Sequence, residues 1–143
     1  MTIRRAEATW HGTLREGSGK MQAGSGSFEL PFNYGTRFSD DSGTNPEEMI
    51  GAALASCFSM SLGAKLSSAG FPPQQIHTQA KVHLGKDEVG SLIQKIELRT
   101  EANAPGVDKT KFLELAEAAR KTCPISRALG GVAEIILDAH LLA

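Results

Sequence analysis

The first third of the chain alternates between apolar and polar positions. Within the stretch from Ile3 to Leu14, the apolar residues Ala6, Ala8 and Trp10 fall on one face. The polar residues on the other face are Arg5, Glu7, Thr9 and His11. A period of two is typical of a strand with one buried face. The stretch from Glu16 to Phe32 is dense in Gly and Ser, which predicts short strands joined by turns.

A long helix is predicted from Pro46 to about Ser68, after the polar loop SDDSGTN. Asn45 can cap it, Pro46 suits the first helical position, and Glu47 and Glu48 complement the positive end of the helix dipole. Glu48 also stands three residues after Asn45, as in a capping box. The helix is apolar on most sides, which predicts burial all round.

The rest of the chain reads as hairpin, helix, short helix and strand. Residues Gln75–Leu84 and Leu92–Arg99 alternate on either side of a GKDEVG turn, Asp108 can cap a second main helix, Pro124 can start a short one, and Ala133–Leu141 alternates again. We expect one α+β domain over residues 1–143, with an antiparallel sheet, two main helices and a long buried central helix.

The composition of the chain argues against several classes of partner. A net charge of −1 over 143 residues gives no electrostatic reason to expect nucleic acid or an anionic membrane. The longest uncharged apolar stretch, Met49 to Ala64, is shorter than the ~20 residues of a membrane span. No apolar run follows Arg4 and Arg5, so we expect no signal peptide, and two cysteines then point to the reducing cytoplasm.

The histidines give no metal site. His77 and His83 share the polar face of one predicted strand but stand ~20 Å apart, too far to chelate one ion. His11 and His140 also fall on polar faces. We expect all four at the surface and no bound metal.

The two cysteines are the remaining candidates for chemistry. Cys57 lies in the middle of the apolar helix, where a small packed side chain is the ordinary interpretation and burial raises the pKa of a thiol. It can react only if a cation reaches it from elsewhere. Cys123 stands just before Pro124, where amides of a new helical turn could stabilise a thiolate, and a packed thiol is equally compatible with this position. The sequence leaves open whether the two sulfurs meet.

Two segments around these cysteines resemble a known family. The run TNPEEMIGAALASCFSMSL, Thr44 to Leu62, is similar to the segment that carries the reactive cysteine in the OsmC/Ohr family, and TCPISRAL, Thr122 to Leu129, resembles the family's second cysteine segment. Chain length and element order agree as well. The lead-in FNYGTRFSDDSGTNPEE is more similar to the osmotically inducible branch of the family than to its organic hydroperoxide resistance branch.

The resemblance implies a thiol peroxidase without metal or organic cofactor. Cys57 matches the peroxidatic cysteine and Cys123 the resolving cysteine, which forms a disulfide with it. Glu47 matches the family's acidic residue, and Arg37 matches, over a looser stretch, the arginine that activates the thiol. The family folds as an intertwined homodimer with long helices at its centre and active sites at the subunit interface.

The same resemblance suggests the substrate and the reductant. An apolar helix face would favour organic hydroperoxides over hydrogen peroxide, and a dithiol such as a lipoyl group would reduce the disulfide. The residues expected to line the substrate pocket are Ile50, Leu54, Phe58 and Met60.

One distance suggests that two chains build the site. Glu47 and Cys57 are ten residues apart on one helix, hence ~15 Å along its axis. We therefore expect Glu47 and Arg37 to serve the Cys57 of the partner subunit. Other interpretations remain: Glu47 can simply complement the helix dipole, and Arg37 can be a solvated loop arginine, with other N-terminal arginines as substitutes, namely Arg4, Arg5 and Arg15.

Two other functions compete with the peroxidase. The protein could be a non-enzymatic, stress-related dimer that holds an apolar ligand, with its thiols merely packed. It could also be a redox sensor that signals through the same disulfide. The position of Cys123 in its turn argues against both.

Overall fold

The structure is a computed structural model that describes all residues from 1 to 143. The chain divides into two compact units, Met1–Met49 and Ile50–Ala143. The predicted α+β class is confirmed, because both units combine strands with helical segments. The assignment of residues 1–143 to one domain stays a prediction.

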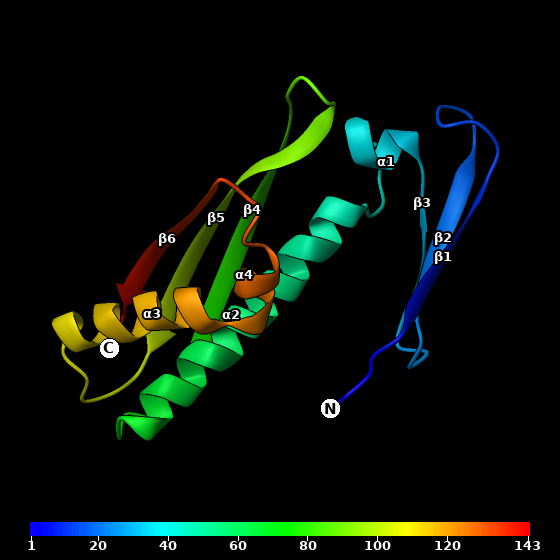
Figure 1. Ribbon diagram of the computed structural model, residues 1–143. Coiled ribbons are helices and arrows are strands. Elements are labelled where there is room, and N and C mark those ends of the chain that lie inside the picture. Colours follow the sequence, from blue (N-terminus) through cyan, green and yellow to red (C-terminus); the bar gives the residue numbers. More distant parts are fainter. The chain divides into compact units, whose positions relative to one another are not determined.

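The first unit holds a three-stranded antiparallel sheet. Strands β1 (Ala6–His11), β2 (Ser18–Ala23) and β3 (Glu29–Phe32) pair in chain order (Figure 1). Polar side chains such as those of Thr9 and Lys20 face each other in the register, and apolar ones occupy the alternate positions. The predicted period of two is therefore confirmed, over a shorter strand than Ile3 to Leu14.

A short helix, α1 (Tyr34–Phe38), follows the sheet and was not expected from the sequence. Asn33 begins it through a capping box, in which its side-chain oxygen accepts from the Thr36 backbone N–H at 2.9 Å and the Thr36 hydroxyl accepts from the Asn33 N–H at 3.0 Å. One helical turn is too short to show an apolar period, so only its cap could have revealed it.

The long helix α2 (Pro46–Ser68) begins at the expected residue. The Asn45 side chain accepts from the Glu48 backbone N–H at 2.8 Å, which confirms the predicted cap. The Glu48 carboxylate accepts from the Thr44 hydroxyl at 3.0 Å, so its side chain does not complete the capping box.

Burial on α2 is one-sided, which corrects the expectation of a helix buried all round. Leu54, Phe58, Leu62 and Leu66 recur every four residues and are fully buried, whereas Met60 on another side is 77% exposed. The apolar character of the exposed side comes largely from alanines. By length and composition α2 could also cross a membrane, a test that core helices of globular proteins pass as well.

The second unit holds a mixed sheet, which corrects the expected antiparallel one. Strands β4 (Gln75–Lys86) and β5 (Ser91–Asn103) form the predicted hairpin, but β6 (Glu134–Leu141) runs parallel to β5. A parallel neighbour needs a long crossover connection, and here helices α3 (Lys109–Thr122) and α4 (Pro124–Ala128) supply it (Figure 1).

The core of the second unit lies between one face of this sheet and the helices that cover it (Figure 1). The alternation of β5 is interrupted where the pairing register shifts between His83 and Leu84. As a result Ile93 packs against the core while Gln94 is exposed. The fully buried larger side chains are Leu54, Phe58, Leu62, Leu66, Ile96, Leu98, Thr100, Phe112 and Cys123.

Candidate active site

The structure brings the two cysteines together. Cys57 lies in the middle of α2, and Cys123 ends α3 and begins α4, where its N–H donates to the Ala119 carbonyl and its carbonyl accepts from the Arg127 N–H. Both are free thiols, and their sulfur atoms lie 2.7 Å apart. A disulfide with an S–S bond of about 2.05 Å would need only a small shift of the two side chains.

The two sulfurs differ in access to solvent. Cys123 is fully buried in the core cluster, whereas Cys57 is partly exposed. A molecule arriving from outside therefore reaches Cys57 first.

Local surroundings favour the thiol form of Cys57 over the thiolate. Burial raises the pKa of the Cys57 thiol, and the hydrogen bond with the Cys123 thiol raises it further. The backbone N–H of Ile125, in the first turn of α4, points at the sulfur and lowers the pKa in part. The amides of the new helical turn thus act on Cys57, although the sequence suggested Cys123 as their target. As expected from the sequence, Cys57 needs a further cation to become a thiolate.

Within the first unit, Arg37 and Glu47 form a bidentate ion pair. Arg37 Nε donates to both carboxylate oxygens of Glu47 at 3.0 and 3.2 Å, and Arg37 Nη2 donates to Oε1 at 2.7 Å. The side chain of Glu47 is 11% exposed and that of Arg37 is 36% exposed. Glu47 therefore holds one edge of the guanidinium, and the Nη1 edge stays available to another acceptor.

The four side chains expected to line a substrate pocket do not share one wall within this chain. Leu54 and Phe58 are fully buried in the core, Ile50 packs against that core, and Met60 is exposed. At about 100° per residue, Met60 lies nearly opposite Phe58 around α2. Their role as a pocket stays a prediction.

Two of the four histidines pair with neighbouring carboxylates. His83 pairs with Glu97 at 2.6 Å, and this hydrogen bond lowers the pKa of the Glu97 carboxyl. His140 Nε2 lies 2.8 Å from Asp138 on the same strand. The expected surface placement holds for three of the four histidines, while His140 is half-buried.

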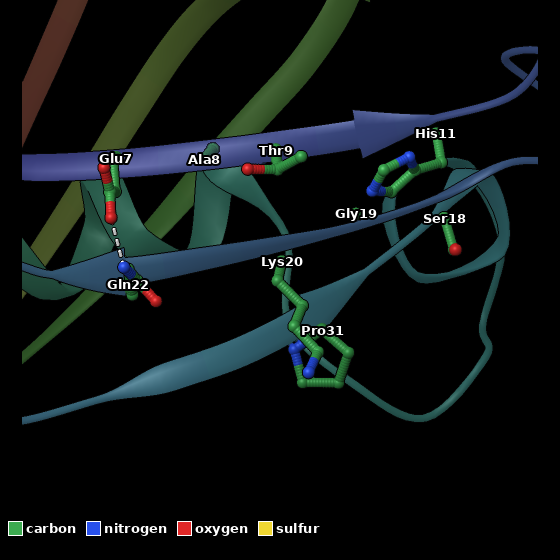
Figure 2. Close-up of a pocket in the computed structure, with 9 residues that line it drawn as sticks. All are labelled: Glu7, Ala8, Thr9, His11, Ser18, Gly19, Lys20, Gln22 and Pro31. Carbon is green, nitrogen blue, oxygen red and sulfur yellow. Dashed lines mark hydrogen bonds between the residues drawn. The ribbon is translucent and has the colours of Figure 1, made fainter.

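A groove of about 470 Å³ lies on the polar face of the first sheet. Figure 2 shows Glu7 and Gln22 hydrogen-bonded across two strands, with His11 and Ser18 farther along the same face. Its walls contain no cysteine and no arginine, so it lacks the groups that peroxide chemistry needs. The lining residues are Glu7, Ala8, Thr9, His11, Ser18, Gly19, Lys20, Gln22 and Pro31.

Two features of the candidate site were missed in the sequence. The Ile125 amide is a backbone group, so no side-chain pattern could have pointed to it. The aromatic residues around Arg37, which line a second cavity, come from β1, β3 and α1, and only the pairing of these elements brings them together.

Comparison with known proteins identifies the family. The model of the family described as OsmC-like protein matches residues 39–138. Peroxiredoxin OsmC of Escherichia coli (strain K12) is 43% identical over 143 residues, which cover 99% of both chains. An organic hydroperoxide resistance protein of Xanthomonas axonopodis pv. citri (strain 306) is 31% identical over 96 residues, which cover 66% of each chain.

Solved structures agree with these sequence relatives. The crystal structure of an organic hydroperoxide resistance protein from Elizabethkingia anophelis matches with a TM-score of 0.76 at 28% identity, and the match covers 98% of both chains. That of the organic hydroperoxide resistance protein OhrB of Bacillus subtilis matches with a TM-score of 0.69 at 25% identity, over 96% of this chain and 97% of the other. The chain therefore belongs to the OsmC-like protein family.

Proposed function

We propose that this protein is a thiol peroxidase that reduces organic hydroperoxides, and hydrogen peroxide more weakly, with Cys57 as the attacking thiol. The contact between Cys57 and Cys123 carries the proposal, because the sulfurs stand 2.7 Å apart in a chain whose relatives are named for peroxiredoxin and hydroperoxide resistance functions. Cys57 is the attacking residue because it is the more exposed sulfur.

The reaction then proceeds in two displacements. The Cys57 thiolate attacks one oxygen of the O–O bond, an S–O bond forms, and the alkoxide leaves and takes a proton to become the alcohol. Cys123 next attacks the sulfenic sulfur of Cys57, an S–S bond forms, and hydroxide leaves as water. Two thiols are oxidised and one hydroperoxide is reduced to alcohol and water, so an external dithiol, of the lipoyl type in this proposal, must reduce the disulfide.

Arg37 supplies the cation that Cys57 lacks. Glu47 occupies the Nε–Nη2 edge of the guanidinium, which fixes its plane and leaves Nη1 to donate to the thiolate and to a peroxide oxygen. An arginine keeps its charge at any working pH, so it can stabilise the thiolate and the developing alkoxide alike.

The active protein is a homodimer in this proposal. One side of α2 exposes Met60 and a row of alanines, a surface that a second copy could cover. Ten residues of helix rise by ~15 Å, so Glu47 and Arg37 would act on the Cys57 of the partner subunit. We place the dimer in the cytoplasm, where thiols are kept reduced between turnovers.

Thiol titration tests the proposal directly. Reduced protein is mixed with one equivalent of cumene hydroperoxide, and free thiols are counted. We expect the wild type to lose two thiols per chain, Cys123→Ser to lose one as a sulfenic acid that dimedone traps, and Cys57→Ser to lose none.

The outcomes separate the competing functions. Unchanged thiols in the wild type would overturn the peroxidase and leave an apolar-ligand binder. The thiols could instead be oxidised once, without further consumption of peroxide when excess dihydrolipoate is added. That result would indicate a redox sensor.

A further inference from the structure

A second cavity in the first unit surrounds the guanidinium of Arg37. Its volume is about 340 Å³, and its walls are mainly aromatic. Besides Arg37 the lining residues are Trp10, Leu14, Phe32, Asn33, Tyr34 and Phe38.

The aromatic rings of this cavity hold one another in place. The Trp10 and Phe32 ring centroids are 5.6 Å apart, those of Tyr34 and Phe38 are 4.9 Å apart, and the Arg37 guanidinium stacks 5.2 Å from the Phe38 centroid. The Arg15 guanidinium covers Tyr34 at 4.7 Å. The walls are therefore preformed, which suits binding of a small molecule.

Most polar groups of the walls are already engaged. The Trp10 indole N–H donates to the Gly12 carbonyl at 2.9 Å, and the Asn33 side-chain oxygen accepts from the Thr36 N–H. Glu47 occupies one edge of Arg37. Besides apolar surface, the walls offer an occupant the free edge of Arg37, the Tyr34 hydroxyl and the Asn33 side-chain N–H groups, which matches a carbon body attached to a peroxide.

Leu14 and Phe38, which line this cavity, are large apolar residues, and they are 60% and 41% exposed. Apolar surface that is exposed next to a paired arginine is surface that a bound ligand would cover. At about 340 Å³ the cavity lies at the small end of ligand pockets, which suits a small organic molecule. Cumene hydroperoxide is a small molecule with an aromatic body, and tert-butyl hydroperoxide is about half as large.

We propose that this cavity binds the carbon body of the substrate and selects hydroperoxides with an aromatic body, and that Leu14 and Phe38 determine this specificity. The inference rests on the proposed function, because it takes Arg37 as the group that meets the peroxide oxygens. Hydroperoxides with small aliphatic bodies leave the aromatic walls uncovered and bind more weakly, by about fourfold for each methylene-sized group not buried.

The test compares kcat/KM for cumene and tert-butyl hydroperoxide, with dihydrolipoate as reductant. We expect Leu14→Ala and Phe38→Ala to lower kcat/KM for the cumene compound by about three- to tenfold and to change that for the tert-butyl compound much less. Leu14→Trp should fill the cavity and exclude the larger substrate selectively. Val89→Ala, in the exposed β4–β5 turn, is the matched control and should keep the wild-type ratio.

An unchanged ratio of the two kcat/KM values in all three cavity variants would overturn the inference. If both values fall equally, the variants have only disturbed Arg37. If the sedimentation coefficient also falls, a second copy of the chain covers the cavity. A wild type that reduces neither substrate would instead refute the proposed function.

Discussion

At the scale of single residues, the surroundings of Cys57, the proposed attacking thiol, do little to make it reactive. Burial and the neighbouring Cys123 thiol raise the pKa of Cys57, and the Ile125 N–H lowers it only in part. The sequence predicted this need for an external cation, because a thiol in the middle of an apolar helix has no charged neighbour. The residues themselves left open whether the sulfurs meet, because only the fold joins residues 66 positions apart, whereas the family resemblance implied the contact that lies at 2.7 Å.

The pH dependence of alkylation tests whether Arg37 meets that need. Only the thiolate reacts, so the rate of Cys57 alkylation by iodoacetamide rises as pH passes through the pKa. We expect the inflection to lie at a higher pH in Arg37→Ala than in the wild type, because the raised pKa is then no longer offset by the guanidinium. Mass spectrometry assigns the modified residue.

Arg5→Ala provides the control, since Arg5 is an exposed arginine of the same unit. It should keep the wild-type inflection. Coincident profiles for all three proteins would mean that Arg37 does not serve Cys57.

At the scale of elements, a chain of hydroxyl groups ties the cysteine helix to its sheet. Ser59 Oγ of α2 lies 2.8 Å from Thr78 Oγ1 of β4, which lies 2.9 Å from Thr100 Oγ1 of β5. Thr100 is fully buried. Because Ser59 is two residues beyond Cys57, these contacts help to fix the rotation of α2, and with it the direction in which Cys57 points.

Removing the last hydroxyl of that chain should destabilise the fold. Thr100→Val keeps the shape of the side chain but takes a partner from the Thr78 hydroxyl, so we expect the free energy of unfolding in urea to fall by about 1–3 kcal/mol. Thr9→Val, on an exposed strand position, should change it by less than about 0.5 kcal/mol. Equal stabilities of the two variants would refute a structural role for the chain.

The elements also show where sequence patterns suffice. Alternation and helix caps predicted the hairpin, the cap of α2 at Asn45 and the cap of α3 at Asp108, which accepts from the Lys111 N–H at 2.8 Å. Strand direction is not encoded in alternation, so the parallel pairing of β6 was missed. Nor does apolar content tell which side of a helix is buried, as the exposed Met60 shows.

At the scale of the whole molecule, the proposed site needs two chains, and a mixed dimer can test this. A Cys57→Ser chain and an Arg37→Ala chain, carrying different tags, are co-expressed and the mixed species is purified. If Arg37 acts across the interface, one of the two sites has both an intact Cys57 and an intact Arg37. We expect peroxide turnover near half that of the wild-type dimer.

Each parent homodimer is the control and should show little turnover. A mixed species as inactive as its parents would place Arg37 and Cys57 of the same chain in one site. If the wild type sediments as a monomer at the concentration of the assay, no dimer interface exists across which Arg37 could act.

The unequal burial of the two sulfurs also sets how the proposed enzyme is recycled. An incoming reductant thiolate must attack a sulfur it can reach, and Cys123 is fully buried. The mixed disulfide therefore forms on Cys57, and Cys123 departs as the leaving thiolate. Exchange in this direction reduces Cys123 first. Cys123 therefore regains its packed position in the core while the reductant is still bonded to Cys57.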